Sequence, residues 1–286
     1  MGIDRVGVVG AGLMGSGIAE VCARSGVDVI VCEADVKAAE AGRQRIEKSL
    51  ARAVNSGKLD EAAQTTVFDR IGFTTDLGEL ADRELVIEAI IESVDEKLDL
   101  FANLDKILAA DDAILASNTS SIPIMKLGMA TERPQQVLGL HFFNPVPVQH
   151  LVELIPSIVT DPEVADRAEA YATNVIGKRV IRSQDRAGFI VNYLFVPYIL
   201  SAIRMFESGF ASAADIDDGM VEGCSHPMGP LALADLVGLD TIKAVADSMY
   251  AEFKEPLYAA PPLLNRMVEA GRLGRKRGRG FYDYAK

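Results

Sequence analysis

Short apolar runs alternate with amphipathic stretches through the first two-thirds of the chain. The runs have the length of buried strands, and the stretches between them repeat apolar residues at helical spacing over residues 35–55, 94–109 and 162–176. This alternation predicts an α/β fold with a doubly wound, mostly parallel sheet. Strands are expected at residues 6–9, 27–32, 85–89, 114–117, 137–140, 151–155 and 180–181.

From Ala187 onward the pattern is helical, and no strand is expected. Apolar residues recur every three or four positions along the first of these helices, which Pro197 should kink. We therefore predict two domains: an α/β domain over residues 1–184, and an all-α C-terminal domain over residues 185–286 whose apolar stripes could bury against a partner chain. Further helices are expected near residues 215–222, 229–237, 240–252 and 261–270.

The junction between the first strand and the first helix carries the sequence Gly10-Ala11-Gly12-Leu13-Met14-Gly15. Gly10 permits a tight turn, Gly12 lets the backbone approach a pyrophosphate, and Gly15 lets the helix pack closely on the strand. The N-terminus of the helix then offers its free N–H groups to the phosphates. The second strand ends at Glu33, whose carboxylate can accept hydrogen bonds from an adenosine ribose.

Strand, glycines, helix and acid follow one another within a single βαβ length, which predicts a Rossmann-like domain that binds NAD. An acid at position 33 would repel a 2′-phosphate and therefore favours NAD over NADP. The candidate cofactor-binding residues of this unit are Gly10, Gly12, Leu13, Met14, Gly15 and Glu33.

The composition narrows the class of protein. The 286 residues carry a net charge of −12, which argues against nucleic acid as a partner. No run of about 18 apolar residues occurs, so no membrane span is expected, and the chain enters its first strand without room for a signal peptide. The scattered cysteines, Cys22, Cys32 and Cys224, lack the spacing of a metal site and are typical of reduced thiols in a cytoplasmic protein.

One segment departs from this acidic balance. Residues 43–58 carry five basic side chains and one acidic one, a local charge of +4. Such a segment would attract a polyanionic ligand, and coenzyme A with its phosphorylated ADP group is one candidate. A solvated helix face explains the charge alone equally well.

One of the three histidines is placed for catalysis. His141 follows a predicted strand, at the sheet edge where doubly wound folds bind ligands, and the prolines after it stiffen the loop. Glu153 lies among apolar residues of the next strand, and burying its charge requires a partner. If the strands are neighbours, Glu153 can orient His141 as a general base; pairing with a lysine or a backbone N–H is the alternative. His150 is expected to be a surface or packing residue, and His226 to cap a helix.

Two further polar sites are candidates for substrate binding. The loop Ser117-Asn118-Thr119-Ser120-Ser121 follows a strand at the same sheet edge and can donate to a substrate oxygen, although such residues also cap helices. Asn192 lies near the apolar face of the first C-terminal helix. A buried asparagine needs hydrogen-bond partners, which a bound ligand could supply.

Taken together, these motifs resemble the L-3-hydroxyacyl-CoA dehydrogenase family over essentially the whole chain, most closely its single-activity bacterial members that act on 3-hydroxybutyryl-CoA. A generic dinucleotide-binding protein shares only the glycine motif. The resemblance rests in addition on Val86 to Ala89, Ala116 to Ser121, Gly139 to Pro147, Leu151 to Glu153, Gly188 to Asn192, Pro227 to Pro230 and Gly238 to Asp240.

The resemblance implies a role for each matching residue. His141 would be the general base and Glu153 its orienting partner, while Ser120 would hydrogen-bond the substrate 3-oxygen and Asn192 would hold the substrate. For NAD, the resemblance points beyond the glycine motif to Glu33, Glu92, Lys97, Ser120, Asn144 and Lys276.

For coenzyme A, the resemblance points to Ser49. A lysine that the animal enzymes place beyond this serine falls at Ser56 here, with Lys58 nearby as the candidate contact. Glu33 is a second departure, because the family pattern has an aspartate at the ribose position.

The implied activity is the reversible NAD-dependent oxidation of an (S)-3-hydroxyacyl-CoA to a 3-oxoacyl-CoA, in a homodimer formed through the helical domain. Two rival functions share part of the pattern: a 3-hydroxyacid or sugar-acid dehydrogenase that does not use coenzyme A, and a non-catalytic NAD-binding protein. Dependence on coenzyme A separates the first rival, and the complete set of candidate catalytic residues weighs against the second.

Overall fold

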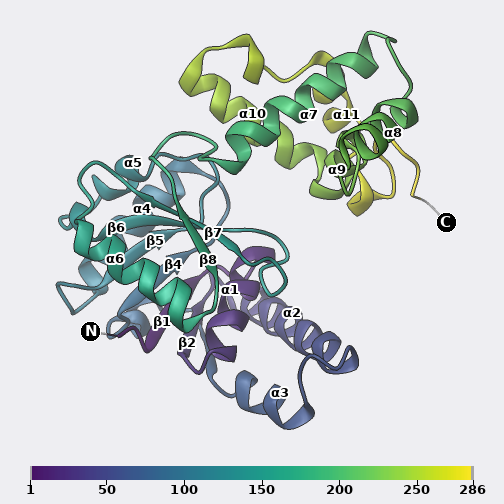
Figure 1. The fold of residues 1–286 in the computed structure, drawn as a ribbon. Coiled ribbons are helices and arrows are strands. Elements are labelled where there is room, and N and C mark those ends of the chain that lie inside the picture. Colours follow the sequence, from purple (N-terminus) through teal and green to yellow (C-terminus); the bar gives the residue numbers. More distant parts are fainter. Residues whose placement is uncertain (1, 285–286) are drawn as a thin grey trace. The chain divides into compact units, whose positions relative to one another are not determined.

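The computed structural model describes residues 2–284. The chain divides into two compact units, Met1–Asp185 and Arg186–Lys286. The first unit holds an open sheet with flanking helices, and the second is built of helices (Figure 1). The predicted fold class, a doubly wound and mostly parallel sheet followed by a helical domain, is confirmed.

The sheet has eight strands in the order β3-β2-β1-β4-β5-β6-β7-β8. Neighbouring strands are parallel except for β6 and β7, which are antiparallel. The direction of winding changes between β1 and β4, and doubly wound sheets bind ligands at such a switch point. The strands are β1 (Arg5–Val9), β2 (Asp28–Cys32), β3 (Ile71–Thr74), β4 (Leu85–Glu88), β5 (Ile114–Ser117), β6 (Val137–Phe142), β7 (Leu151–Pro156) and β8 (Arg179–Arg182).

The inner strands are buried because helices pack on both sheet faces (Figure 1), whereas the edge strands β3 and β8 are largely exposed or half-buried. Alternate residues of one strand point to opposite faces. In β1, for example, Val6 and Val8 join a core that includes Ile18 of α1, whereas a Cβ on Gly7 would meet Leu80 and Val86. The helices of this unit are α1 (Leu13–Arg24), α2 (Val36–Asn55), α3 (Glu61–Phe68), α4 (Val94–Ile107), α5 (Ile124–Gly128) and α6 (Pro162–Ala170), the last continued by a π-helical turn at Tyr171–Val175.

Strand β3 and helix α3 were not predicted. β3 is a short edge strand with Gly72 in its middle and only Ile71 buried, so the sequence has neither a full apolar run nor a clear alternation. It becomes a strand because it pairs with β2 over Val29 to Cys32. The reason is therefore tertiary, and local propensity did not reveal it.

The second unit packs its helices around a core of its own. Helix α7 is one element with Pro197 inside it, as its apolar spacing predicted, and the kink at this proline stays a prediction. The remaining helices lie close to the predicted ranges, and Gly and Pro residues separate them as expected. The helices are α7 (Val191–Glu207), α8 (Ala213–Cys224), α9 (Pro230–Val237), α10 (Leu239–Phe253) and α11 (Pro262–Glu269).

Two buried carboxylates hold the C-terminal segment of this unit. Asp235 accepts hydrogen bonds from the backbone N–H groups of Phe281 and Tyr282, each at 3.0 Å. Asp217 accepts a bond of 2.7 Å from the Tyr282 hydroxyl. A Cβ on Gly280 would lie 1.9 Å from Asp235 Oδ1, so a glycine is required where the segment crosses this acid.

Candidate active site

The turn between β1 and α1 requires its first and third glycines. Gly10 has a φ of +93°, and a Cβ on it would lie 2.7 Å from the carbonyl oxygen of Ala89. A Cβ on Gly15 would lie 1.8 Å from the carbonyl oxygen of Gly10. The space at Gly12 is open, because a Cβ added there would have no heavy atom within 4 Å beyond the neighbouring residues. No side chain caps the N-terminus of α1. The turn therefore leaves the helix N–H groups accessible to phosphate oxygens.

A cavity of ≈ 750 Å³ adjoins this turn. Glu33, just after β2, folds its carboxylate onto the turn and accepts hydrogen bonds from Ala11 N at 2.5 Å and Ala34 N at 3.1 Å. An acid at this place and an open glycine turn fit the ribose and the pyrophosphate of NAD. The predicted residues Gly10, Gly12, Leu13, Met14 and Glu33 all line the cavity.

His141 and Glu153 face each other across the antiparallel pair β6 and β7. The register of β6 and β7 sets them directly opposite, and His141 Nδ1 lies 2.7 Å from Glu153 Oε2. Both are buried, at 5% and 0% exposure. An ionised carboxylate only accepts hydrogen bonds, so Nδ1 of the histidine carries the proton of this bond. The neutral ring therefore presents a lone pair at Nε2, which is what a general base requires.

Ser120 completes a three-residue constellation. It lies in the loop after β5, and its Oγ is 3.0 Å from His141 Nε2. Asn118 ties the same loop to β6 by accepting a bond of 2.8 Å from Phe142 N. A polar atom of a substrate placed at Ser120 Oγ would therefore also meet the basic nitrogen of His141.

Glu92 and Lys97 hold the loop that carries Ser120. Glu92 accepts bonds from Thr119 Oγ1 at 2.5 Å and Ser120 N at 3.1 Å, and its other oxygen lies 2.8 Å from Lys97 Nζ. Burial by itself raises the pKa of Glu92. The charge of Lys97 and the bonds from Lys97, Thr119 and Ser120 outweigh burial, so the pKa is lowered from the ordinary 4.5.

This lowered pKa predicts an acid-sensitive contribution to stability. A folded-state pKa below the unfolded value stabilises the fold above pH 4.5, and the contribution is lost as pH falls through the folded pKa. Urea unfolding of wild type and Glu92→Gln should therefore give a difference in unfolding free energy that is constant at neutral pH and shrinks as the pH falls from about 5 to about 3. Glu40→Gln, at an exposed position of α2, is the control. A difference that stays constant across this range would contradict the assignment.

Ser49 and Asn144 line a second hollow of ≈ 430 Å³. α1, α2 and the loop after β6 form its walls, and Arg45, Lys48 and Arg52 of α2 make it basic. Buried Glu20 lies at the same wall. Burial raises its pKa, and the hydrogen bond with Ser49 and the charge of Arg24, which lower the pKa, do not outweigh burial. Part of the basic segment thus faces a hollow large enough for a ligand, as a site for polyanions requires.

Three predicted contacts are not among the residues that line these two hollows. Lys58 is exposed in the turn after α2 and does not line the basic hollow. Asn192 is half-buried in the first turn of α7, in the second unit. Lys276, also in the second unit, pairs with Asp240 at 2.6 Å. The other candidates of the first unit belong to the glycine turn, line the two hollows or belong to the network of His141, and the roles of all the candidates stay predictions.

The other two histidines, His150 and His226, lie outside the constellation of His141, Glu153 and Ser120. His150 is exposed just before β7, and its carbonyl accepts a bond of 2.7 Å from Arg179 N. His226 lies between α8 and α9, where its Nδ1 is 3.2 Å from the Tyr198 hydroxyl. Neither residue meets an acid–serine pair in the part of the chain that the structure describes.

Glu88 is a residue of this network that the sequence analysis did not single out. It ends β4 with 0% exposure and lies 2.8 Å from Lys97 Nζ. The signal was available, because Glu88 is a lone acid in an apolar strand, as Glu153 is. The same argument about the cost of burying a charge applies to both.

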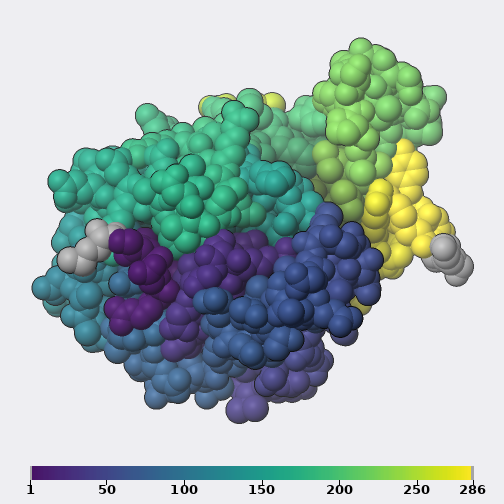
Figure 2. All heavy atoms as spheres, turned by 60° about the horizontal axis from the view of Figure 1, so that its bottom comes forward, coloured from purple at the N-terminus to yellow at the C-terminus, as the bar shows by residue number. Residues whose placement is uncertain are grey.

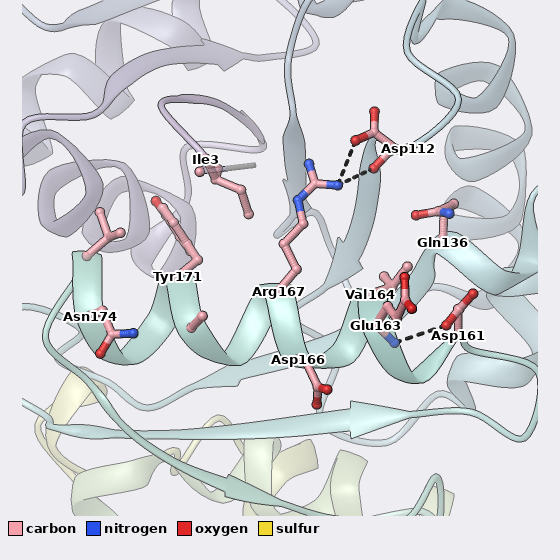
Figure 3. Close-up of a pocket in the computed structure, with 13 residues that line it drawn as sticks. Ile3, Asp112, Gln136, Asp161, Glu163, Val164, Asp166, Arg167, Tyr171 and Asn174 are labelled. Carbon is pink, nitrogen blue, oxygen red and sulfur yellow. Dashed lines mark hydrogen bonds and ion pairs between the residues drawn. The ribbon is translucent and has the colours of Figure 1, made fainter.

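A third hollow lies at the opposite ends of the strands. It has ≈ 720 Å³ and is lined by Ile3, Asp112 and the outer side of α6, where Arg167 Nη1 pairs with Asp112 at 3.0 Å (Figure 3). Figure 2 shows the purple N-terminal segment bordering the green of α6 on this face. None of the predicted catalytic or cofactor-binding residues lines it, and ligands of doubly wound sheets bind at the other edge.

Residues 2–284 hold neither a candidate membrane span nor a candidate metal site. No helix there is long and apolar enough to cross a membrane. No group of three or more His, Cys, Asp or Glu side chains there is placed to hold a metal ion. The described cysteines are unpaired, with Cys22 and Cys32 buried and Cys224 exposed.

The fold and the site define an NAD-binding dehydrogenase architecture with an acid–histidine pair at the ligand edge of the sheet. The chain belongs to the 3-hydroxyacyl-CoA dehydrogenase family: residues 5–186 match the model of its NAD binding domain, and residues 188–284 match that of its C-terminal domain.

Relatives support this membership over the full length. The chain is 61% identical to a 3-hydroxybutyryl-CoA dehydrogenase of Mycobacterium tuberculosis, covering 99% of each chain. Among solved structures it is similar to M. tuberculosis FadB2, with a TM-score of 0.99, 60% identity and 100% coverage of both chains. It is also similar to (S)-3-hydroxybutyryl-CoA dehydrogenase PaaH1 of Ralstonia eutropha, with a TM-score of 0.93, 43% identity, and coverage of 99% of this chain and 100% of that one.

Proposed function

We propose that this protein catalyses the reversible NAD-dependent oxidation of (S)-3-hydroxyacyl-CoA to 3-oxoacyl-CoA, with 3-hydroxybutyryl-CoA as a substrate. The observation that carries the proposal is the buried His141–Glu153 pair, with Ser120 Oγ 3.0 Å from the other ring nitrogen, Nε2. This pair lies at the carboxyl edge of a sheet whose first turn fits NAD. The names of the most similar relatives support the same substrate.

In the oxidative direction, His141 Nε2 takes the proton of the substrate 3-hydroxyl. Glu153 stabilises the positive ring that results, because its carboxylate already accepts from Nδ1. Ser120 orients the substrate oxygen against Nε2, which is a matter of positioning. NAD, when bound, supplies the acceptor for the hydride that leaves C3. In the reverse direction, His141 returns the proton to the alkoxide oxygen.

The remaining predicted contacts divide between the two ligands. Gly12 would let the pyrophosphate approach the backbone, with Leu13 and Met14 beside it, in the turn that Gly10 and Gly15 make possible, and Glu33 would bind the ribose. The family resemblance assigns Glu92, Lys97, Ser120, Asn144 and Lys276 to further NAD contacts. It assigns Ser49 and Lys58 to coenzyme A and Asn192 to the acyl part of the substrate.

The organisation of the protein follows from the same proposal. Residues 1–184 would bind NAD, and residues 185–286 would bind substrate and form a homodimer. Exposed apolar side chains of the helical unit, among them Leu194, Phe210 and Leu257, support a partner surface. Unpaired cysteines support our expectation of a cytoplasmic location.

The test is turnover of NADH with acetoacetyl-CoA by the purified protein. We expect NADH to be consumed with acetoacetyl-CoA, and NADPH to be a poorer cofactor because Glu33 would meet its 2′-phosphate. Equal turnover of free acetoacetate would instead favour a 3-hydroxyacid dehydrogenase that ignores coenzyme A. Binding of NAD without turnover of either substrate would favour a non-catalytic NAD-binding protein.

A further inference from the structure

Glu88 is a buried carboxylate with three different donors. Its oxygens lie 2.8 and 3.0 Å from Lys97 Nζ, 2.6 Å from Ser117 Oγ and 2.7 Å from Ile90 N. An acid with 0% exposure is costly unless its charge is paired and hydrogen-bonded. Here both conditions are met, so the group is held in one orientation.

Each of these donors belongs to a different part of the proposed site. Ile90 lies in the loop after β4 and lines the cofactor cavity. Lys97 on α4 also reaches Glu92, at 2.8 Å. Ser117 ends β5 directly opposite Glu88 in the strand register, and its Oγ accepts from Thr119 N at 3.1 Å.

Two short routes lead from Glu88 to Ser120. One runs through Ser117, whose hydroxyl fixes the backbone at Thr119 at the start of the loop. The other runs through Lys97 to Glu92, which accepts from Ser120 N. Ser120 Oγ then meets His141 Nε2. Glu88 itself is separated from His141 by β5, since the strand order is β4-β5-β6.

We propose that Glu88 is a positioning residue for the dehydrogenase reaction: it fixes, through Ser117 and the Lys97–Glu92 pair, the place of Ser120 against His141. This inference rests on the proposed function. Glu88 acts only through other residues and makes no contact with the reacting atoms. At saturating NADH, where a loss of cofactor affinity does not limit the rate, its effect on kcat should therefore pass through Ser120.

A double-mutant cycle between Glu88 and Ser120 tests this dependence. Glu88→Gln keeps the shape of the side chain but turns an amide NH₂ toward Lys97, so the lysine loses its buried counter-charge. We expect Glu88→Gln to lower kcat with acetoacetyl-CoA about tenfold or more. In a Ser120→Ala background the same change should lower kcat less than about threefold further, because Ser120 is no longer there to be placed.

Two more variants separate positioning from stability. Asp105→Asn is the matched control. Asp105 is a buried acid on the same helix α4, and its carboxylate pairs with Arg133 at 2.6 Å instead of with the loop that carries Ser120. It should lower the melting temperature but leave kcat near wild type. Ser117→Ala removes one route without changing any charge, and should repeat the non-additive loss of kcat even if Glu88→Gln fails to fold.

The outcomes distinguish this inference from the proposed function. The positioning role alone would be overturned by the following result: the wild-type protein turns over, and Glu88→Gln and Ser117→Ala each lower kcat as much in the Ser120→Ala background as in the wild-type background. Wild-type kcat in both single variants would overturn it as well. Absence of turnover in the wild-type protein would overturn the proposed function, and the role of Glu88 with it.

Discussion

His141→Ala is expected to lower kcat by about a thousandfold or more, since a positioned general base typically contributes about 10²–10⁴-fold. The variant loses Nε2, the atom to which the substrate proton would go, and it also leaves Glu153 buried without the ring. The glycine turn and Glu33 are untouched, so the affinity for NAD should stay close to wild type. Initial rates with acetoacetyl-CoA and a titration of the cofactor measure the two effects separately.

His150→Ala is the matched control, because His150 is exposed and lies outside the catalytic constellation. It should retain wild-type turnover. Near-normal kcat in His141→Ala would remove this histidine from the mechanism. A parallel loss of NAD affinity would show instead that the substitution had damaged the fold of the sheet edge.

Glu153→Gln is expected to lower kcat by about a thousand- to ten-thousandfold, by analogy with the loss seen when the acid of an acid–histidine pair becomes an amide. The carboxylate can only accept, which forces the proton onto His141 Nδ1. A glutamine can also donate, which favours the ring tautomer with the proton on Nε2. That tautomer has no lone pair to offer the substrate.

Glu153→Asp separates charge from reach. It keeps an acceptor-only group but shortens it, so it should recover part of the turnover that Glu153→Gln loses. Asp105→Asn again controls for the general loss of a buried acid and should leave kcat unchanged. Equal turnover in Glu153→Gln and wild type would show that the acid does not select the tautomer of His141.

Local patterns in the chain were sufficient for most elements of the fold. The apolar run at Val6 to Val9 and the glycines after it predicted β1, the turn and α1, because a tight turn and close packing each demand a residue without a side chain. Helical spacing predicted α7 on both sides of Pro197. β3 and α3 were not predicted because little of either is buried: only Ile71 in the strand and Val67 in the helix.

Within the site, too, local patterns predicted some features and not others. A lone acid in an apolar strand indicated that Glu153 needs a partner, and its place one strand after His141 made that histidine a candidate. Glu88 sends the same signal, but its partners lie on β5 and α4, so no neighbouring motif pointed to them. Lys58 was placed near coenzyme A by resemblance, and the structure leaves it exposed beyond the basic hollow.

The sequence alone determined which chemical groups stand at the ends of which strands, since strand length, glycine turns and buried acids are local properties of the chain. Only the tertiary structure decided which of these groups meet. His141 is opposite Glu153, and Glu88 opposite Ser117, because of the strand order and the register of each pair. Register depends on packing between segments far apart in the chain, and a slip of one residue would turn each side chain to the other face of the sheet.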